Sequence, residues 1–283
     1  MMGKATVVGA GTMGAAIAQV FASNGYEVSL IDVTIEFAEK GYSRIENSLA
    51  KLMEKGKVTA EEKNQTLNNI TISTSMEQCA GSCIAIEAIS ENMQLKHSVF
   101  QELEKYIGEE ALLVSNTSSL SITEIAAALK HKERFLGMHF FNPPIIMKLV
   151  EIIKGEHTSR ESMEKTIHIA QKIGKVPVCV NESAGFVVNR ILIPMINEGI
   201  GVYADGVASA EDIDVAMKLG ANHPMGPLAL GDLVGLDVCL AIMEVLYAET
   251  GDTKYRPHPL LRKMVRAGKL GRKTGLGFFC YTS

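Results

Sequence analysis

Short apolar runs rich in β-branched residues alternate, in the first two-thirds of the chain, with longer segments whose apolar residues recur at helical spacing. Alternation of this kind is typical of a sheet with helices packed on its faces. The runs predict eight strands, at residues 4–8, 26–31, 70–73, 83–88, 112–114, 135–141, 147–153 and 175–180. We therefore expect a Rossmann-type α/β domain over residues 1–183.

Residues 34–68 do not look like a simple connection between two strands. Apolar residues from Phe37 to Met53 follow helical spacing, and Thr59–Glu62 has the capping-box pattern that opens a second short helix. The segment therefore predicts a helical hairpin inserted in the α/β domain. The same capping pattern at Ser121–Glu124 and Thr158–Glu161 predicts that two further helices begin there.

Beyond the segment 181–185, only the helical period remains, which predicts an all-α domain over residues 184–283. Its expected helices lie at 186–203, 209–219, 236–248 and 259–267, and a connection with two prolines is expected at 220–231. The first of these helices is apolar on nearly every face. Such a helix is expected to be buried, either within its own domain or against another subunit.

The composition narrows the class of protein. The chain has 283 residues, a hydrophobic content of 47% and a net charge of −4, which fits a globular protein of two domains without the basic surface that nucleic acid requires. No apolar run approaches the roughly 18 residues that span a membrane, and the N-terminus resembles a strand rather than a signal peptide. Five cysteines, without the spacing of a disulfide framework or a metal site, favour reduced, buried thiols in a cytoplasmic protein.

The sequence Gly9-Ala10-Gly11-Thr12-Met13-Gly14 links the first strand to the first helix. In a dinucleotide-binding turn the first glycine permits a tight turn, the second lets the backbone approach a pyrophosphate, and the third lets helix and strand pack closely. Asp32 ends the next strand, at the position of a carboxylate that binds the adenosine ribose. This context predicts an NAD site and disfavours NADP, whose 2′-phosphate would face a like charge. The alternative is a glycine-rich turn in another kind of βαβ unit.

A second candidate site lies in the pair of strands around Asn142-Pro143-Pro144. If the two strands fold back about residue 145, His139 and Glu151 lie directly opposite each other, within side-chain contact. An imidazole held by a carboxylate is a general base with a fixed tautomer. The alternative is a partly buried histidine whose hydrogen bonds are satisfied by a neighbour.

Other polar residues follow strand ends, where an open α/β sheet binds its ligands. Glu87, Glu91 and Asn92 come at the C-terminal end of one strand, and the segment from Ser115 to Ser119 comes at the end of the next, although small hydroxyl residues before a helix are often only caps. The hairpin lysines form either a solvated face or a phosphate-binding face. Asn189 in the long apolar helix needs a hydrogen-bond partner, which could be another helix.

With these segments identified, the chain resembles the 3-hydroxyacyl-CoA dehydrogenase family over essentially its whole length, most closely its bacterial members that act on 3-hydroxybutyryl-CoA. Several blocks in the same order carry the resemblance: VVGAGTMGAAIAQ, IEAISENMQLK, SNTSSLSI, GMHFFNPP with MKLVE, GFVVNRI, DIDVAMKLGANHPMGPLAL and GRKTGLGFF. Ser90 stands where relatives often have valine. Ile31 replaces an arginine of some relatives, which agrees with NAD rather than NADP.

The resemblance implies roles for individual residues. It implies His139 and Glu151 as the catalytic pair, with Ser118 and Asn189 contacting the substrate. It implies that Glu91 and Lys96 lie near the nicotinamide. The full set of implied cofactor-binding residues is Gly9, Gly11, Thr12, Met13, Gly14, Asp32, Glu91, Lys96 and Asn116. It also implies that Ser48 and Lys55 on the hairpin contact coenzyme A, and that no metal takes part.

The function that the resemblance implies is reversible hydride transfer between NAD(H) and the C3 atom of an (S)-3-hydroxyacyl-CoA, such as 3-hydroxybutyryl-CoA, by a homodimer joined through the helical domain. The sequence leaves two other classes of function open. One is a related dehydrogenase of a hydroxy acid or sugar acid without coenzyme A. The other is a non-enzymatic structural protein or NAD sensor on the same fold. Such a protein would be expected to lack His139 or Glu151, and both are present.

Overall fold

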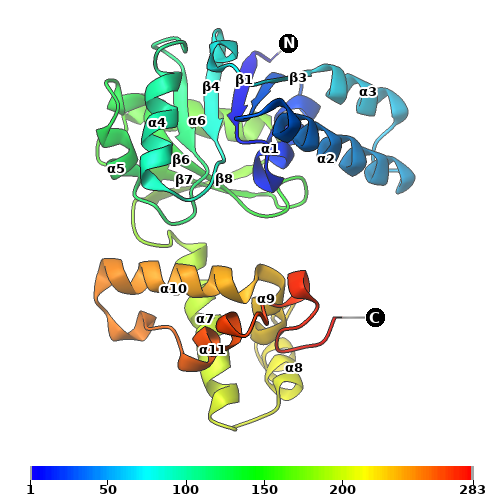
Figure 1. Cartoon of the computed structure of the whole chain (residues 1–283), viewed down its shortest axis with the longest axis vertical. Coiled ribbons are helices and arrows are strands. Elements are labelled where there is room, and N and C mark those ends of the chain that lie inside the picture. The colour runs from blue at the N-terminus through cyan, green and yellow to red at the C-terminus, as the bar shows by residue number, and fades with distance from the viewer. Residues whose placement is uncertain (1, 282–283) are drawn as a thin grey trace. The chain divides into compact units, whose positions relative to one another are not determined.

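The computed structural model describes residues 2–281, and the chain divides into two compact units, Met1–Glu182 and Ser183–Ser283 (Figure 1). The sequence had placed the boundary between residues 183 and 184.

The first unit contains one eight-stranded sheet with the strand order β3-β2-β1-β4-β5-β6-β7-β8. Its strands are β1 (Lys4–Val8), β2 (Glu27–Ile31), β3 (Ile70–Ser73), β4 (Ser82–Glu87), β5 (Leu112–Ser115), β6 (Phe135–Phe140), β7 (Leu149–Lys154) and β8 (Val176–Asn181). Neighbouring strands are parallel except β6 and β7, which pair antiparallel. The predicted α/β fold and its strands are confirmed, with small differences at the strand ends.

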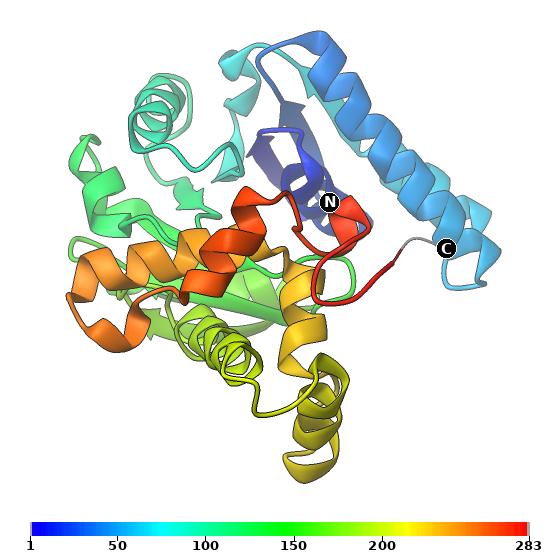
Figure 2. The ribbon, with the colours of Figure 1, turned by 60° about the horizontal axis from the view of Figure 1, so that its bottom comes forward.

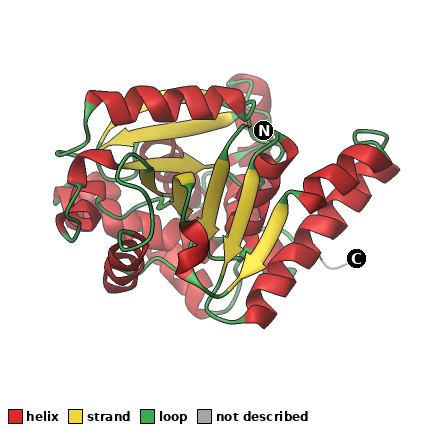
Figure 3. Ribbon diagram, turned by 90° about the horizontal axis from the view of Figure 1, so that it is seen from above, coloured by secondary structure: helices red, strands yellow, loops and turns green. Residues whose placement is uncertain are grey.

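Helices of the first unit lie against this twisted sheet, shown in yellow in Figure 3. They are α1 (Thr12–Ser23), α2 (Ile35–Glu54), α3 (Ala60–Asn68), α4 (Met93–Leu103), α5 (Ile122–Ala127) and α6 (Arg160–Lys172). The central strands are nearly continuous apolar runs, as in β1, where the last four residues are buried. Such runs are expected where both faces of a parallel sheet are covered. Ile17 and Phe21 of α1 are fully buried in the same core.

The helical hairpin predicted at 34–68 is present as α2 and α3, which run beside each other in Figure 2. Thr59 and Glu62 form the predicted capping box in full. Gly41 lets α2 approach the glycine-rich turn, because a Cβ atom at this position would lie 2.6 Å from the Cβ of Ala10. The hairpin is therefore packed next to the predicted cofactor site.

The predicted start of α6 is wrong by one residue. Ser159, not Thr158, caps the helix, and its hydroxyl accepts a hydrogen bond from the Ser162 N–H. The Thr158 hydroxyl is instead buried, where it accepts from the Gly155 N–H and donates to the Phe135 carbonyl. A hydroxyl used in this way is not available to cap a helix.

At α5 the predicted cap Ser121 is present, and its side chain accepts a hydrogen bond from the Glu124 N–H. The carboxylate at this helix start comes from a distant residue, however. Glu182 accepts hydrogen bonds from the Ser121 and Thr123 hydroxyls and from the Thr123 N–H. The last residue of the first unit is thus tied to the start of α5.

The second unit is helical, with α7 (Val188–Ala204), α8 (Ala210–Gly220), α9 (Pro227–Val234), α10 (Leu236–Thr250) and α11 (Pro259–Arg266). The sequence analysis assigned most of α9 to a connection. Pro227 is the first residue of this helix, a position that suits proline. The cap comes from Asp214 on α8, which accepts hydrogen bonds from the Leu228 and Ala229 N–H groups, so no local cap marked the helix in the sequence.

One prediction about burial needs correction. The thiols are not all buried, because Cys79 and Cys239 are buried but Cys83 and Cys179 are exposed. Helix α7 buries one face within its own unit, including Ile193, Ile196 and Ile200, whereas Ile191 is 67% exposed. Burial of the other face against another subunit stays a prediction. Within residues 2–281, no helix has the length and apolar character that crossing a bilayer demands.

Candidate active site

The antiparallel pair β6–β7 brings His139 and Glu151 together. The two residues are directly opposite in the strand register, as the sequence predicted, and His139 Nδ1 lies 2.8 Å from Glu151 Oε2. His139 is 6% exposed and Glu151 is 1% exposed. A buried carboxylate at this distance fixes the orientation and the tautomer of the ring.

The surroundings of this pair hold the histidine in place. The Phe141 ring packs against the imidazole with 4.5 Å between the ring centroids. The turn between the strands is held by Lys175, whose ammonium donates to the carbonyls of Pro144 and Met147. Both contacts restrict the movement of the segment that links β6 to β7, directly after His139 and Phe140.

Asn116, predicted to bind the cofactor, lies just after the end of β5. Its Oδ1 accepts a hydrogen bond of 2.9 Å from the Phe140 N–H, next to His139. Its own N–H donates to the Glu87 carbonyl. The residue thus ties the ends of β4, β5 and β6 together, whatever further contact its amide makes with a ligand.

The glycine-rich turn has the geometry that a dinucleotide requires. Gly9 has a φ of +98°, in the region that favours glycine. A Cβ atom on Gly14 would lie 1.7 Å from the Gly9 carbonyl oxygen, so only glycine allows α1 to start so close to the turn. At Gly11, by contrast, nothing lies within 4 Å of where a Cβ would stand, and a pyrophosphate could approach the backbone there. Thr12 and Met13 form the first turn of α1.

Asp32 lies beside this turn, directly after β2. Its Oδ2 accepts a hydrogen bond of 2.6 Å from the Ala10 N–H, and its Oδ1 accepts one of 2.7 Å from the Val33 N–H. The carboxylate is therefore held at the position expected to bind ribose hydroxyls. These residues fit the adenosine and pyrophosphate parts of NAD.

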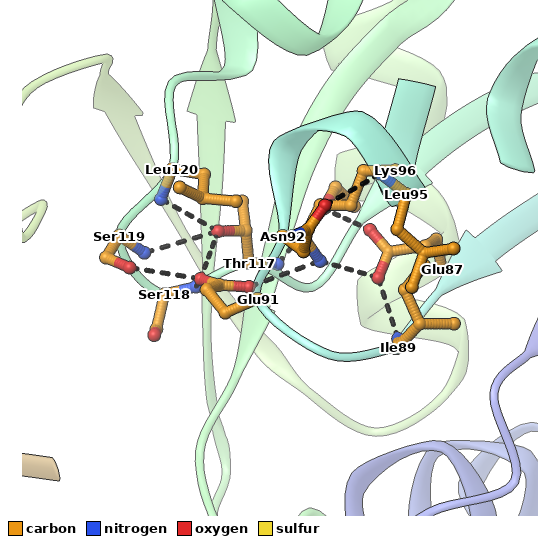
Figure 4. Close-up of polar contacts among 11 residues, drawn as sticks. Glu87, Ile89, Glu91, Asn92, Leu95, Lys96, Thr117, Ser118, Ser119 and Leu120 are labelled. Carbon is orange, nitrogen blue, oxygen red and sulfur yellow. Dashed lines mark hydrogen bonds and ion pairs between the residues drawn. The ribbon is translucent and has the colours of Figure 1, made fainter. Parts of the chain in front are cut away.

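A connected set of charged and hydroxyl side chains occupies the carboxyl ends of β4 and β5 (Figure 4). Lys96 on α4 is 1% exposed, and its Nζ lies 2.6 Å from Glu87 Oε1 and 3.2 Å from Glu91 Oε2. Glu91 Oε1 accepts hydrogen bonds from the Thr117 hydroxyl at 2.5 Å and from the Ser118 N–H at 3.1 Å. The predicted residues Glu91, Lys96 and Ser118 therefore belong to one network.

The charge state of Glu91 follows from these partners. Burial raises the pKa of the Glu91 carboxyl, but the Lys96 ammonium and the hydrogen bonds from the 117–118 segment lower it by more. The net result is a pKa below the ordinary value for a glutamate. Glu91 is therefore a carboxylate at neutral pH.

Three predicted substrate residues make no contact within this network among the interactions of the described residues. Ser48 lies on α2, and its hydroxyl oxygen is buried without a hydrogen-bond partner among the residues described. Lys55 is the exposed residue that caps the C-terminus of the same helix. Asn189 lies in the first turn of α7 in the second unit, nearer the helix start than the sequence suggested.

The sequence analysis placed Glu87, Thr117 and Ser119 at ligand-binding strand ends but gave none of the three a role of its own. The Ser119 hydroxyl donates to Glu91 Oε1 at 3.1 Å. The signal was present, because polar residues follow two successive strands. That these strands are neighbours in the sheet was not evident from the spacing alone.

Comparison with known proteins accounts for both units. Residues 4–183 match the family described as 3-hydroxyacyl-CoA dehydrogenase, NAD binding domain. Residues 185–281 match the family described as 3-hydroxyacyl-CoA dehydrogenase, C-terminal domain.

Individual relatives cover nearly the whole chain. A 3-hydroxybutyryl-CoA dehydrogenase of Clostridioides difficile is 54% identical over 278 residues, which are 98% of this chain and 99% of the relative. The human mitochondrial hydroxyacyl-coenzyme A dehydrogenase is 43% identical over 98% of this chain and 90% of its own length. The crystal structure of an (S)-3-hydroxybutyryl-CoA dehydrogenase from Ralstonia eutropha superposes with a TM-score of 0.95 at 48% identity, covering 99% of both chains.

Proposed function

Since this chain belongs to the 3-hydroxyacyl-CoA dehydrogenase family of NAD-dependent oxidoreductases, we propose that it interconverts acetoacetyl-CoA and (S)-3-hydroxybutyryl-CoA. The observation that carries the proposal is the buried contact of 2.8 Å between His139 Nδ1 and Glu151 Oε2, in the same sheet as a glycine-rich turn that fits a dinucleotide. The names of the relatives from Clostridioides difficile and Ralstonia eutropha support the choice of substrate.

In this mechanism Glu151 holds Nδ1 of the imidazole, so proton exchange with the substrate falls to Nε2 of His139. In the oxidation direction His139 removes the proton from the 3-hydroxyl group, and Glu151 stabilises the imidazolium that forms. In the reduction direction the imidazolium returns that proton to the forming alkoxide. Bound NAD supplies the hydride acceptor, and NADH the donor, at the C4 atom of nicotinamide.

Ser118 and Asn189 are proposed to hydrogen-bond the substrate oxygen and to hold C3 in line for the transfer. The backbone of Ser118 is already fixed by its hydrogen bond to Glu91, which supports a positioning role. Orientation of this kind contributes up to roughly 7–11 kcal/mol to a rate enhancement. Gly9, Gly11, Thr12, Met13, Gly14 and Asp32 are proposed to hold the pyrophosphate and the adenosine ribose, with Glu91, Lys96 and Asn116 toward the nicotinamide.

Ser48 and Lys55 are proposed to bind coenzyme A. The buried, unpartnered hydroxyl of Ser48 supports this role, because a ligand group would satisfy it. Lys55 lies seven residues after Ser48, at the C-terminal cap of α2. Seven residues make about two helical turns, so the two residues lie on nearly the same side of the helix, where the Lys55 ammonium would bind a phosphate.

We also propose a cytoplasmic homodimer formed through the helical unit. Large apolar side chains on this unit are exposed in the single chain, among them Ile191, Val207 and Leu219. Thiols such as Cys83 and Cys179 are not in disulfides, which suits a reducing compartment. Sedimentation at increasing protein concentration tests the dimer directly.

The test of the function is a comparison of initial rates with NADH and two substrates, acetoacetyl-CoA and free acetoacetate. We expect turnover with the thioester and little with the free acid, and a higher kcat/KM with NADH than with NADPH. Equal rates with free acetoacetate would favour a dehydrogenase that does not need coenzyme A. Binding of NADH without turnover of any 3-ketoacyl-CoA would favour a non-enzymatic protein.

A further inference from the structure

We propose that Glu87 is a positioning residue at the nicotinamide end of the cofactor site, and that it also has an electrostatic role. The Glu87 carboxylate neutralises the Lys96 ammonium, so the negative charge of Glu91 stays uncompensated and favours binding of NAD⁺ over NADH. The inference rests on the proposed function, because it requires a nicotinamide cofactor at this sheet edge. It concerns a residue that does not contact the reacting atoms in the mechanism above.

The position of the nicotinamide half follows from the strand order. In a doubly wound sheet a dinucleotide lies across the point where the strand order reverses, with one nucleotide on each side. Here that point lies between β1 and β4, and Asp32, after β2, marks the adenosine side. The other nucleotide therefore lies over the carboxyl ends of β4 and β5, where Glu91 and the 117–119 segment are found.

Glu87 is the last residue of β4 and is completely buried. Its Oε1 accepts hydrogen bonds from the Ile89 N–H at 2.7 Å and from Lys96 Nζ at 2.6 Å, and its Oε2 accepts one from the Ser115 hydroxyl at 2.7 Å. A buried carboxylate with three donors is held in one orientation. Glu87 is thus a fixed point to which β5 and α4 are both attached.

The network that starts at Glu87 closes into a ring. One arm runs through the Ser115 hydroxyl, which accepts a hydrogen bond of 3.1 Å from the Thr117 N–H. The other arm runs through Lys96 to Glu91, whose Oε1 accepts from the Thr117 hydroxyl. Both arms meet at Thr117, immediately before the proposed substrate residue Ser118. A shift of Glu87 would therefore move Glu91 on the cofactor side and Thr117, next to Ser118, on the substrate side.

The ring contains three charged side chains, so their charges do not cancel. Glu87 and Glu91 are acidic and Lys96 is basic, so the three side chains together carry one negative charge. The side chains of Glu87 and Lys96 are 0% and 1% exposed, whereas that of Glu91 is 36% exposed. The buried pair cancels internally, and the remaining charge lies on the one carboxylate that a ligand can approach.

This remaining charge distinguishes the two forms of the cofactor. The nicotinamide ring is cationic in NAD⁺ and neutral in NADH, so a nearby uncompensated carboxylate favours NAD⁺. Without the charge of Glu87, Lys96 would compensate Glu91 and the preference would disappear. The structural role and the electrostatic role of Glu87 can therefore be separated by measuring the binding of both forms.

The experiment measures the Kd of NAD⁺ and of NADH, by calorimetry and by NADH fluorescence, for the full-length protein and for Glu87→Gln. The amide keeps the shape of the side chain but removes the charge. We expect the ratio of the two Kd values to shift against NAD⁺ by about tenfold, the size expected for one unit charge in a partly solvated site. Ser115→Ala is the matched control, because it breaks the other arm of the ring without changing a charge and should leave the ratio within twofold.

Two further variants keep the test decisive. In the double variant Glu87→Gln/Lys96→Met only the charge of Glu91 remains, so the ratio should return to the wild-type value. Lys96→Met alone leaves two negative charges and should shift the ratio toward NAD⁺, and this opposite shift provides the test if Glu87→Gln does not fold.

The possible outcomes are distinct. An equal loss of NAD⁺ and NADH affinity in Glu87→Gln, or an unchanged ratio in Lys96→Met, would overturn the inference while leaving the proposed function intact. A wild-type protein that binds neither form of the cofactor would overturn both.

Discussion

At the scale of single residues, the pairing of His139 with Glu151 is the feature on which the chemistry depends. Glu151 is almost completely buried, and a carboxylate in such a place is costly unless a charged or hydrogen-bonded partner satisfies it. His139 is that partner, at 2.8 Å. The same contact that stabilises the buried carboxylate therefore prepares the imidazole to accept a proton.

Replacing the base tests this pairing. We expect His139→Gln to lower kcat with acetoacetyl-CoA by at least about 100-fold, because general acid–base catalysis contributes roughly 10²–10⁴-fold, while the Kd of NADH stays within about threefold. The matched control is His131→Gln, since that histidine pairs with Glu133 on the surface. If His139→Gln retains turnover within tenfold of the wild type, the base is another residue.

Ser48 offers a second prediction, in which binding and stability separate. Its hydroxyl is buried and unpartnered among the described residues, so Ser48→Ala should leave the free energy of unfolding unchanged or slightly raised. If the hydroxyl binds coenzyme A, the KM for acetoacetyl-CoA should rise about fivefold, the effect of one neutral hydrogen bond of about 1 kcal/mol.

The control for this prediction is Ser43→Ala, an exposed serine on the same helix. It should change neither the KM nor the midpoint of urea unfolding. A large loss of stability in Ser48→Ala, with an unchanged KM, would show that the hydroxyl has a structural role instead.

At the scale of elements, the sequence predicted those helix starts and strand registers that depend on residues close together in the chain. The register of β6 and β7 could be derived because the connection is centred on residue 145, midway between His139 and Glu151. The start of α3 could be derived because Thr59 and Glu62 cap it themselves. Helix α9 was missed because its capping carboxylate, Asp214, belongs to another helix. The partners of Glu91 were missed for the same reason, since Thr117 and Ser119 become its neighbours only in the folded sheet.

The start of α6 allows a local interaction, the helix cap, to be compared with a tertiary hydrogen bond. Ser159→Ala removes a helix cap and should lower the free energy of unfolding by about 1 kcal/mol. Thr158→Ala leaves a buried N–H at Gly155 and a buried carbonyl at Phe135 without their partner, so it should cost more, roughly 2–4 kcal/mol. Urea unfolding monitored by circular dichroism measures both values. The reverse order would mean that the local cap, and not the tertiary contact, dominates at this position.

The network between β4 and β5 predicts a pH dependence of stability. The pKa of Glu91 is lowered in the folded protein, so its contribution to stability is present above the pKa of the unfolded chain and is lost as the pH falls through the folded pKa. The difference in stability between the wild type and Glu91→Gln should therefore shrink as the pH is lowered below about 4.5. Urea unfolding of both proteins between pH 7 and pH 3 measures it. A difference that stays constant over this range would contradict the lowered pKa.

At the scale of the whole molecule, the proposed functions are divided between two units that each have a hydrophobic core of their own. The glycine-rich turn, Asp32 and the His139–Glu151 pair all lie in the first unit, whereas Asn189 lies in the second. Binding of the cofactor should therefore need only the first unit, and turnover should need both.

A fragment of residues 1–182 tests this division. We expect it to bind NADH with a Kd within about tenfold of the full chain, because the proposed dinucleotide contacts are local to the sheet edge. Turnover of acetoacetyl-CoA should fall by at least about 100-fold, since the substrate would lose Asn189 and the orientation that it provides. NADH fluorescence and initial rates measure the two properties, and the His139→Gln form of the fragment sets the background rate. A fragment that turns over substrate at the rate of the full chain would show that the helical unit serves assembly alone.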